Sequence, residues 1–403
     1  MLNCFNRCQC ALTISAPDLH DRYLNGLGWG TSFQDQDRVH TARDLWESIV
    51  EGQASSLVRW TLGPLLTILT YPYDWGHQLK LQAYHRRWAT VKQLPCRVIS
   101  IGNLTLGGTG KTPIVEVVAD LLQQAGIRVG VLSRGYGGGG SSGITVVSDG
   151  KRCLVPPEVA GDEPVLLAEH LAGLPVIVGK DRYAAGMHAV ERFGVDAIVL
   201  DDGFQHIQLA RDLNILLLDA ARPFGNGRLF PRGDLRDRPA AIVRADIIVL
   251  TRWEADTAPS PSVSRLGRSG LPLFCSRHAP LDLRVLADGP TLPLTALKGR
   301  RVLAFCGIGM PHHFRLTLQR LGAEIAAFVA FPDHHPYAPS EIERLILTAK
   351  QHHVEILVTT EKDGVRLRRL QPLAAQVWEL RIRATIVEQE AAWKTHIVDA
   401  IAG

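Results

Sequence analysis

The amino-acid sequence predicts an α/β protein with a doubly wound, mostly parallel sheet and a second, smaller α/β domain. Two observations favour this fold class. Short, nearly continuous runs of Val, Ile and Leu alternate with helical stretches, which is the pattern of parallel strands buried on both faces. A stretch rich in turn-forming residues then separates two sets of such runs. The 403 residues suffice for two or three domains with cores of their own.

The first set of apolar runs predicts six strands, at 97–102, 128–133, 176–179, 196–200, 214–219 and 246–251. The second set predicts three strands, near 301–306, 324–331 and 355–359. We therefore divide the chain into an N-terminal extension of low structural content, a helical segment, a core domain, a linker and a smaller domain, at 1–42, 43–95, 96–257, 258–298 and 299–403. In a doubly wound sheet, ligands sit beyond the carboxyl ends of the strands.

Composition narrows the setting of the protein. A net charge of +4 favours neither a nucleic-acid coat nor an acidic tail, so we expect no nucleic-acid partner. Seven irregularly spaced cysteines are typical of reduced thiols in the cytoplasm, and Cys4, Cys8 and Cys10 lack a second pair of ligands at zinc-site spacing. No apolar run reaches the roughly 18 residues that cross a bilayer, and the first residues do not read as a signal sequence.

The segment before the first strand combines apolar and basic character. An apolar patch at 60–71 is followed by a stretch from Trp75 to Val115 that contains no Asp or Glu and six Lys or Arg residues. An apolar helix face beside cations suits the surface of an anionic membrane. A buried helix followed by a solvated basic helix has the same pattern, and the residues alone leave both interpretations open.

A glycine-rich loop follows the first strand and opens a helix at Pro113. Closely approaching amides, a fixed cation and a hydroxyl for Mg²⁺ are what a nucleoside triphosphate requires. Thr105 stands where the usual consensus has glycine, but the strand–loop–helix context is kept, so we predict a P-loop NTPase-type core that binds ATP. The candidate binding residues are Thr105, Gly107, Gly108, Thr109, Gly110, Lys111 and Thr112.

Carboxylates follow the phosphate loop in the chain. The strand that ends at Asp201-Asp202 places a carboxylate where it can hold Mg²⁺, although an aspartate after a strand is more often a turn or cap residue. Asp162, at the expected start of a helix, is a candidate for the base that takes a proton from an acceptor hydroxyl. Three His-His pairs occur, but adjacent side chains rarely point to one centre, and we reject a metal site built from them.

Taken together and in order, the motifs resemble the tetraacyldisaccharide 4'-kinase family of lipid A biosynthesis. The resemblance spans about residue 43 to the C-terminus and is carried by the segments at 100–113, 133–136, 161–164, 179–182, 201–206, 331–335 and 359–363. It implies transfer of the γ-phosphate of ATP, with Mg²⁺, to the 4'-hydroxyl of a lipid-linked disaccharide 1-phosphate, which gives lipid IVA. It further implies a peripheral protein at the cytoplasmic face of the inner membrane, docked through the segment at 43–95, and we expect a monomer.

The resemblance also assigns roles to single residues. Lys111, Asp162 and His334 match the catalytic positions, with His334 pairing with the base from the smaller domain. Metal positions are matched by Thr112, Asp201, Asp202 and Glu163, and positions near the sugar-phosphate acceptor by Tyr136, Arg182, Gln205 and Arg236.

One position departs from the family pattern, because Asp237 stands where the family tends to have glutamate. Two rival functions share such a phosphate loop. A partitioning or transport ATPase carries a signature lysine before the glycine pair, where this chain has Leu106. A soluble metabolite kinase or ligase with the same core fits the acid-free stretch and the apolar patch less well.

Overall fold

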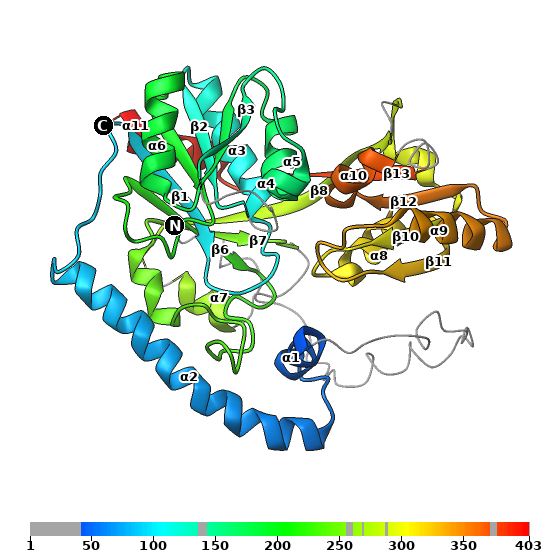
Figure 1. The fold of residues 1–403 in the computed structure, drawn as a ribbon, viewed down its shortest axis with the longest axis horizontal. Coiled ribbons are helices and arrows are strands. Elements are labelled where there is room, and N and C mark those ends of the chain that lie inside the picture. Colours follow the sequence, from blue (N-terminus) through cyan, green and yellow to red (C-terminus); the bar gives the residue numbers. More distant parts are fainter. Residues whose placement is uncertain are drawn as a thin grey trace, which may run out of the picture. The chain divides into compact units, whose positions relative to one another are not determined.

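The computed structural model describes residues 42–135, 143–254, 261–267, 270–286, 289–370 and 377–402 (Figure 1). The chain divides into two compact units, Met1–Ala42 and Arg43–Gly403, so all described residues except Ala42 belong to the second unit. The extension predicted at 1–42, with the Cys4, Cys8 and Cys10 cluster, therefore lies outside the described residues except for its last position.

The larger domain is built on a mostly parallel sheet with the strand order β8-β7-β6-β1-β5-β2-β4-β3, in which only β3 is antiparallel to its neighbour. Its strands are β1 (Arg97–Asn103), β2 (Val129–Ser133), β3 (Thr145–Asp149), β4 (Pro175–Val178), β5 (Ala197–Asp201), β6 (Leu213–Asp219), β7 (Ile247–Thr251) and the first residues of β8 (Leu273–Val285). The six runs predicted from the sequence correspond to β1, β2, β4, β5, β6 and β7.

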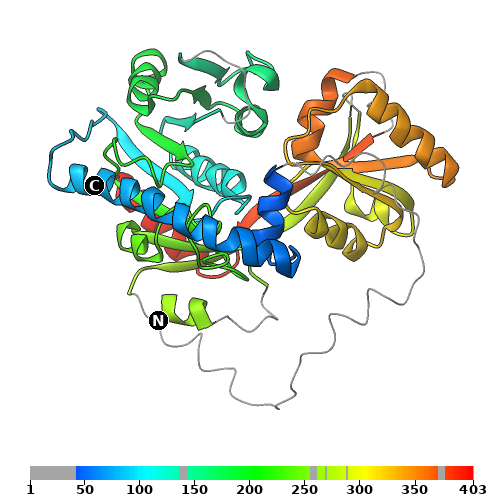
Figure 2. The same cartoon turned by 60° about the horizontal axis from the view of Figure 1, so that its bottom comes forward.

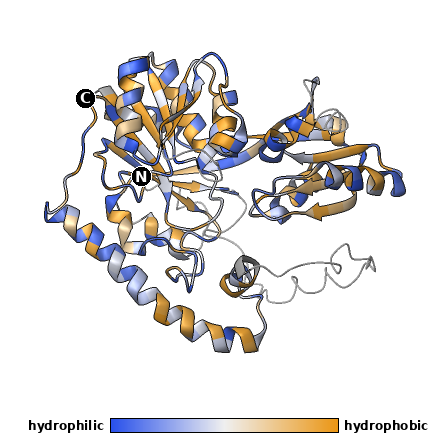
Figure 3. Cartoon of the chain, in the orientation of Figure 1, coloured by the Kyte–Doolittle hydropathy of each residue, from blue (hydrophilic) through white to orange (hydrophobic). Residues whose placement is uncertain are grey.

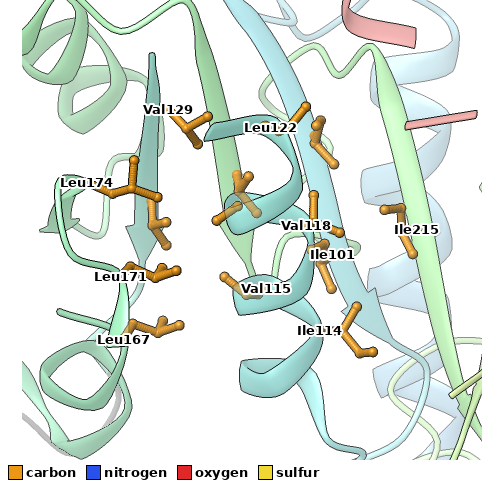
Figure 4. Packing of buried hydrophobic residues seen from close by; sticks show 14 of the residues in the cluster. Ile101, Ile114, Val115, Val118, Leu122, Val129, Leu167, Leu171, Leu174 and Ile215 are labelled. Carbon is orange, nitrogen blue, oxygen red and sulfur yellow. The ribbon is translucent and has the colours of Figure 1, made fainter. Parts of the chain in front are cut away.

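Helices cover both faces of this sheet, as the continuous apolar runs predict. Its helices are α3 (Lys111–Gln124), α4 (Pro157–Ala160), α5 (Asp162–His170), α6 (Arg182–Phe193), α7 (Pro261–Leu266), α11 (Glu390–Ala402) and the 3-10 helix η1 (Pro239–Arg244). On one face, Ile114, Val118 and Leu122 of α3 pack against Ile101 of β1 and Ile215 of β6 (Figure 4). On the other face, α6 packs against residues of β1, β2, β4 and β5.

The smaller domain is a second α/β layer with the strand order β11-β10-β12-β13-β8. Its elements are β9 (Thr291–Leu292), η2 (Leu294–Leu297), β10 (Arg301–Cys306), α8 (Pro311–Arg320), β11 (Glu324–Ala330), α9 (Pro339–Gln351), β12 (Ile356–Thr360), α10 (Glu361–Leu367), η3 (Arg368–Leu370) and β13 (Val377–Ile386). α9 packs on one face through Ile342 and Leu345, and α8 on the other through Phe314 and Leu318. The three predicted strands correspond to β10, β11 and β12.

A two-stranded ribbon joins the domains, where the sequence predicts a linker at 258–298. β8 pairs in parallel with β7 at its start and then antiparallel with β13 over most of its length, so one strand belongs to both sheets (Figure 1). After β13 the chain returns to the larger domain, where Val387 N donates to Cys275 O at 2.9 Å. α11 then buries Trp393, Ile397 and Ile401 in the core of the larger domain.

Two helices precede the sheet, α1 (Ala42–Glu51) and α2 (Ser56–His85), and α2 lies along the larger domain (Figure 2). α2 holds the loop that precedes η1: Tyr73 Oη donates to Arg236 O at 2.9 Å, and the ring of Tyr73 meets Phe230 edge to face. Trp46 of α1 donates to Pro231 O in the same loop at 2.7 Å. None of the helices among the described residues has the length and apolarity that crossing a membrane would require.

Candidate active site

The glycine-rich loop lies where the sequence predicts it, between β1 and the first residue of α3. Gly107 and Gly110 take positive φ angles of 100° and 74°, which side chains rarely tolerate. Gly110 has a second reason to be glycine, since a Cβ there would overlap the ring of His278 on β8. Arg252, at the end of β7, donates to Gly108 O and also pairs with Asp219. The loop is thus held against the carboxyl ends of β6 and β7 and the middle of β8.

Lys111 occupies the first position of α3, and its ammonium points to the neighbouring strand ends. Its Nζ atom lies 3.4 Å from Asn103 Oδ1 at the end of β1 and 3.6 Å from Asp202 Oδ1 just beyond β5. The phosphate loop and the acidic pair predicted to share its metal therefore lie side by side. Thr105 is 8% exposed, and Thr109 is 5% exposed, so both loop hydroxyls are buried.

Asp201 ends β5 in a fully buried position. Its Oδ2 atom accepts a hydrogen bond of 3.0 Å from Ser133 at the end of β2. Burial, reinforced by the charges of Glu163 and Asp202, raises the pKa of Asp201 to about 6. Its Oδ1 atom is buried and has no hydrogen-bond partner among the described residues. An orphaned carboxylate oxygen in this place suits a cation or a water bound to a cation.

Asp202, the next residue, has a positive φ of 53° and two cationic partners. Arg236 Nη1 donates to both of its carboxylate oxygens, at 3.0 and 2.8 Å, and Lys111 lies on the other side. Burial alone raises the pKa of Asp202, but these two cations outweigh it and hold the pKa below its usual value. Gln205 joins the same turn to β1 by donating to Asn103 O at 2.7 Å.

Asp162 lies at the first position of α5, 8% exposed, and meets the smaller domain there. Its Oδ2 atom is 2.9 Å from His334 Nδ1 and 2.9 Å from Arg366 Nε. His334 takes a φ of 62°, and its amide donates to Gly307 O at 3.2 Å. The structure thus brings together the aspartate and the histidine that the sequence predicts as a pair, 172 positions apart.

Glu163, the neighbour of Asp162, is bound by a lysine from α10. Lys362 Nζ lies 2.9 Å from Glu163 Oε1, 3.3 Å from His334 Nε2 and 3.9 Å from Asp333 Oδ1. Burial lowers the pKa of Lys362, but Glu163 and Asp333 outweigh it and raise the pKa. Burial raises the pKa of Glu163, and Lys362 outweighs it and lowers the pKa. Both side chains are therefore charged at neutral pH.

The predicted acceptor contacts of Arg182 and Tyr136 stay predictions. Arg182, at the start of α6, is 3% exposed and donates to Ser133 O at 2.8 Å and to Gly179 O at 2.5 Å. In this structure its guanidinium binds strand-end carbonyls, and a contact with the acceptor stays a prediction. Tyr136 lies outside the described residues.

Asp237, the departure from the family pattern, is 1% exposed and forms an ion pair with Arg244 of η1. His77 of α2 lies 3.6 Å from its second oxygen. The shorter side chain therefore still has a cationic partner, and it connects η1 with α2.

Sequence reasoning did not single out Asn103, Ser133, Lys362 or Arg366, which all contact predicted site residues. Asn103, Ser133 and Lys362 stand in the segments that carry the family resemblance, so those segments contained the signal. Arg366 stands one turn after Lys362 on α10, and helical spacing from that segment is what could have found it. The described residues hold no group of three or more His, Cys, Asp or Glu side chains arranged to bind a metal alone.

Comparisons with known proteins show the family of this chain. The model of the family described as tetraacyldisaccharide-1-P 4'-kinase matches residues 62–402. The tetraacyldisaccharide 4'-kinase of Syntrophus aciditrophicus is 45% identical over 340 residues, covering 81% of this chain and 90% of that protein. The enzyme of the same name from Geobacter metallireducens is 46% identical over 303 residues, covering 75% and 88%.

A solved structure is similar over nearly its whole length. The crystal structure of LpxK from Aquifex aeolicus in complex with ATP has a TM-score of 0.70 and 35% sequence identity, and the match covers 84% of this chain and 99% of that one. The phosphate loop, the acidic pair and the Asp162–His334 contact all lie within the matched residues 62–402. The chain belongs to the tetraacyldisaccharide-1-P 4'-kinase family.

Proposed function

We propose that this protein transfers the γ-phosphoryl group of ATP to the 4'-hydroxyl of tetraacyldisaccharide 1-phosphate, the step that gives lipid IVA. Family membership, and a relative whose crystal structure contains ATP, support the reaction class. The single observation that carries the proposal is the convergence of two groups at one sheet edge. Lys111 lies beside Asp202, and Asp162 of the adjoining α5 meets His334 from the smaller domain.

ATP binds, in this proposal, with its phosphates on the loop from Thr105 to Thr112. The amides at the start of α3 point toward the anion, and the helix dipole adds a positive potential there. Lys111 supplies the fixed cation for the β- and γ-phosphates. Phosphoryl transfer requires little covalent help from the protein, so positioning and charge neutralisation account for most of the rate enhancement.

The carboxylates near the phosphate loop fit Mg²⁺. Asp201 has a buried oxygen with no partner among the described residues, and Asp202, Glu163 and the Thr112 hydroxyl are the further candidate ligands. Magnesium is usually bound by one or two carboxylates together with substrate phosphates and water, which agrees with the absence of a complete protein cage among the described residues. The ion would neutralise charge on the phosphate oxygens.

Asp162 is the proposed general base. The 4'-oxygen forms a bond to the γ-phosphorus while the bond from that phosphorus to ADP breaks, and the hydroxyl proton passes to the Asp162 carboxylate. His334 binds the carboxylate at 2.9 Å and so fixes its orientation. Because the base and its partner belong to different domains, the site is complete only when the two domains are in contact.

The acceptor would lie beside the turn that carries Asp202. Arg236 and Gln205 border this turn, and we propose them as acceptor contacts together with Arg182 and Tyr136. Arg236 also belongs to the loop that α2 holds through Tyr73. The side chain of Arg236 therefore contacts Asp202, and its backbone contacts α2.

α2 is the proposed membrane contact. Gly63 is its only buried residue, and eight large hydrophobic side chains along it stand 45–82% exposed. Trp88 and Val91, just after the helix, are 72% and 44% exposed. Apolar residues recur along the helix, most densely in its N-terminal half (Figure 3). The acid-free basic stretch follows the apolar patch. We therefore propose a peripheral protein on the cytoplasmic face of the inner membrane, where a tetraacylated acceptor resides.

A direct assay tests the proposal. The purified protein is incubated with Mg-ATP and tetraacyldisaccharide 1-phosphate in mixed micelles, and the lipid product is analysed by mass spectrometry. The expected product is heavier by one phosphoryl group, located on the non-reducing sugar. ATP hydrolysis that proceeds at the same rate without the lipid, and leaves the lipid unchanged, would identify a switch ATPase instead.

A further inference from the structure

Lys362 of α10 touches both halves of the candidate site. Its ammonium lies 2.9 Å from Glu163 Oε1 on the larger domain and 3.3 Å from His334 Nε2 on the smaller domain. The side chain is 23% exposed, so it is mostly enclosed by these partners. Nothing in the phosphate-binding or proton-accepting roles described above requires a lysine here.

The ammonium bears on the tautomer of His334, because it lies 3.3 Å from Nε2, closer than the Asp333 carboxylate at 3.8 Å. A lysine ammonium has three donors and no acceptor, so a hydrogen bond to His334 Nε2 requires a lone pair on that nitrogen. A neutral imidazole with a lone pair on Nε2 carries its proton on Nδ1. A protonated imidazole would instead set a second positive charge, with an N–H group, against the ammonium.

We infer that Lys362 is a positioning residue that holds His334 as the neutral tautomer protonated on Nδ1, and thereby orients Asp162 for the reaction. The Nδ1–H group donates to Asp162 Oδ2 at 2.9 Å. This hydrogen bond leaves Oδ1 of the carboxylate for the hydroxyl proton. With the other tautomer, two lone pairs would face each other and the carboxylate would lose this partner.

Lys362 also connects the two domains beside the Asp162–His334 contact. Glu163 follows Asp162 directly on α5, so the Lys362–Glu163 ion pair anchors the ammonium to the same helix turn that carries the proposed base. Asp333, 3.9 Å from the ammonium, precedes His334 on the smaller domain. The ammonium is thus fixed from both sides, and its direction toward His334 Nε2 follows from these anchors.

The tautomer can be measured without nucleotide or lipid. In protein with ¹⁵N-labelled histidine, the two ring nitrogens of His334 report which one carries the proton, and His334→Gln assigns the signals. We expect Nδ1–H in the wild-type protein at pH 7.5. In Lys362→Met the Nε2–H tautomer or the imidazolium should gain a substantial share, whereas Lys362→Arg, which keeps a donor, should retain most of the wild-type state.

Two further variants separate a direct contact from an indirect one. Lys394→Met removes an exposed lysine that pairs with Glu390 on α11 and should leave the His334 signals unchanged. Glu163→Gln removes the charge of this Lys362 partner but keeps an amide oxygen that can accept from the Lys362 ammonium. The contact between Lys362 and His334 should therefore remain, and the Nδ1–H tautomer should persist. Loss of that tautomer in Glu163→Gln would mean that Lys362 does not hold His334 directly, and would overturn the inference.

Kinetics test whether Lys362 helps to orient Asp162, a role that rests on the proposed function of Asp162 as the base. Lys362→Met should lower kcat by at least about 10-fold, since a misaligned base forfeits part of the 10²- to 10⁴-fold that general-base catalysis contributes. The KM for ATP should change less than about 3-fold, because no phosphate contact is lost. An unchanged kcat, or a large rise in KM alone, would overturn the orienting role.

Failure of the tautomer inference can be distinguished from failure of the proposed function. A wild-type protein with Nε2–H or a cationic His334 contradicts the tautomer, whatever reaction the protein catalyses. A protein with the expected tautomer but no lipid phosphorylation contradicts the proposed function and leaves the tautomer in place. If Lys362→Met does not fold, the wild-type spectrum together with Lys362→Arg still decides the question.

Discussion

Buried charged side chains at the contact between the domains depend on ionic partners. Asp162 is nearly buried and is shared between His334 and Arg366, which come from different elements of the smaller domain. A buried carboxylate is stable only when such partners compensate its desolvation. The same partners position Asp162 for proton transfer, so its contribution to stability and its proposed function depend on one geometry.

Asp162→Asn should reduce kcat by about 10²-fold or more while changing the KM for ATP little, because the amide keeps the shape but cannot accept the hydroxyl proton. Steady-state kinetics with varied ATP measure both constants. Glu158→Gln is the matched control, since Glu158 on α4 also crosses the domain contact, to Arg369, without approaching the phosphate loop. If the main effect of Asp162→Asn were weaker ATP binding, Asp162 would be a metal ligand rather than the base.

His170 forms a second charged contact between the domains, away from the phosphate loop. Its Nδ1 lies 2.8 Å from Glu116 on α3, and its Nε2 lies 2.7 Å from Glu361 on α10. Burial lowers the pKa of His170, but the hydrogen bonds to these two carboxylates outweigh it and raise the pKa to about 10. The imidazole is therefore an imidazolium at neutral pH, with a carboxylate on each side.

Stability should fall with rising pH because of this residue. A pKa raised above the unfolded value of about 6.5 stabilises the folded state fully below pH 6.5. That contribution is lost progressively as the pH rises toward 10. His170→Gln should lower the free energy of unfolding by about 3 kcal/mol at pH 6 and by less at pH 9.5. Urea denaturation at both pH values checks this, and an equal effect at the two would show that His170 is uncharged.

At the scale of elements, α2 carries many apolar side chains that are exposed rather than buried. Trp60 and Ile68 are 82% and 64% exposed, although both favour burial strongly. Its polar contacts are limited to one side, where Asp74 pairs with Arg238 and Tyr73 meets the loop before η1. A helix with one docked side and one exposed apolar side requires a further apolar surface to cover it.

Replacing Trp60 and Ile68 together by Ser should weaken partition onto anionic vesicles by at least about 10-fold, because each side chain loses about 1.5–3 kcal/mol of apolar transfer. Sedimentation with vesicles of phosphatidylglycerol and phosphatidylethanolamine measures the partition. Leu347→Ser, at a 58% exposed position on α9, is the control and should bind as the wild type does. Equal binding of the double variant and the control would exclude α2 as the membrane contact.

The sequence reveals some elements and conceals others for a physical reason. Central strands such as β1 and β5 are buried on both faces, so most of their residues are apolar and they are recognised as runs. β8 and β13 are partly exposed, so charged residues such as Arg277 and Arg383 stand among apolar ones. β8 also contains Pro280, which a strand rarely contains. The predicted linker at 258–298 therefore concealed a 13-residue strand.

The site was predictable to the extent that local segments carry it. The phosphate loop is visible because Gly107 and Gly110 satisfy a backbone requirement that no other residue meets easily. The contact between Asp162 and His334 came from family resemblance, since local spacing does not link residues 172 positions apart. Lys362 and Arg366 were missed because their partners are fixed only when α10 packs against α5.

At the scale of the whole molecule, the last helix stabilises the first domain. α11 follows the smaller domain in the chain, yet Trp393 is 1% exposed in the core of the larger domain, with its ring edge to face against Phe274 at 5.3 Å. Ile397 and Ile401 extend the same contact. The larger domain is therefore completed only after the smaller domain has been synthesised.

Trp393→Ala should destabilise the larger domain by about 3–5 kcal/mol, the usual cost of a cavity left by a buried tryptophan. Chemical denaturation followed by circular dichroism measures the change. Trp88→Ala, at a 72% exposed tryptophan, should change stability by less than about 1 kcal/mol. Similar effects of the two substitutions would place Trp393 outside the core.

The hydrogen bond between Val387 and Cys275 has a consequence for how the chain is assembled. It brings together the two points at which the backbone leaves the larger domain and returns to it. A short turn grafted between these points would replace residues 276–386 and close the chain at little entropic cost. Such a shortened protein keeps the glycine loop, Lys111 and Asp201 but lacks His334 and Lys362, so it would separate nucleotide capture from catalysis.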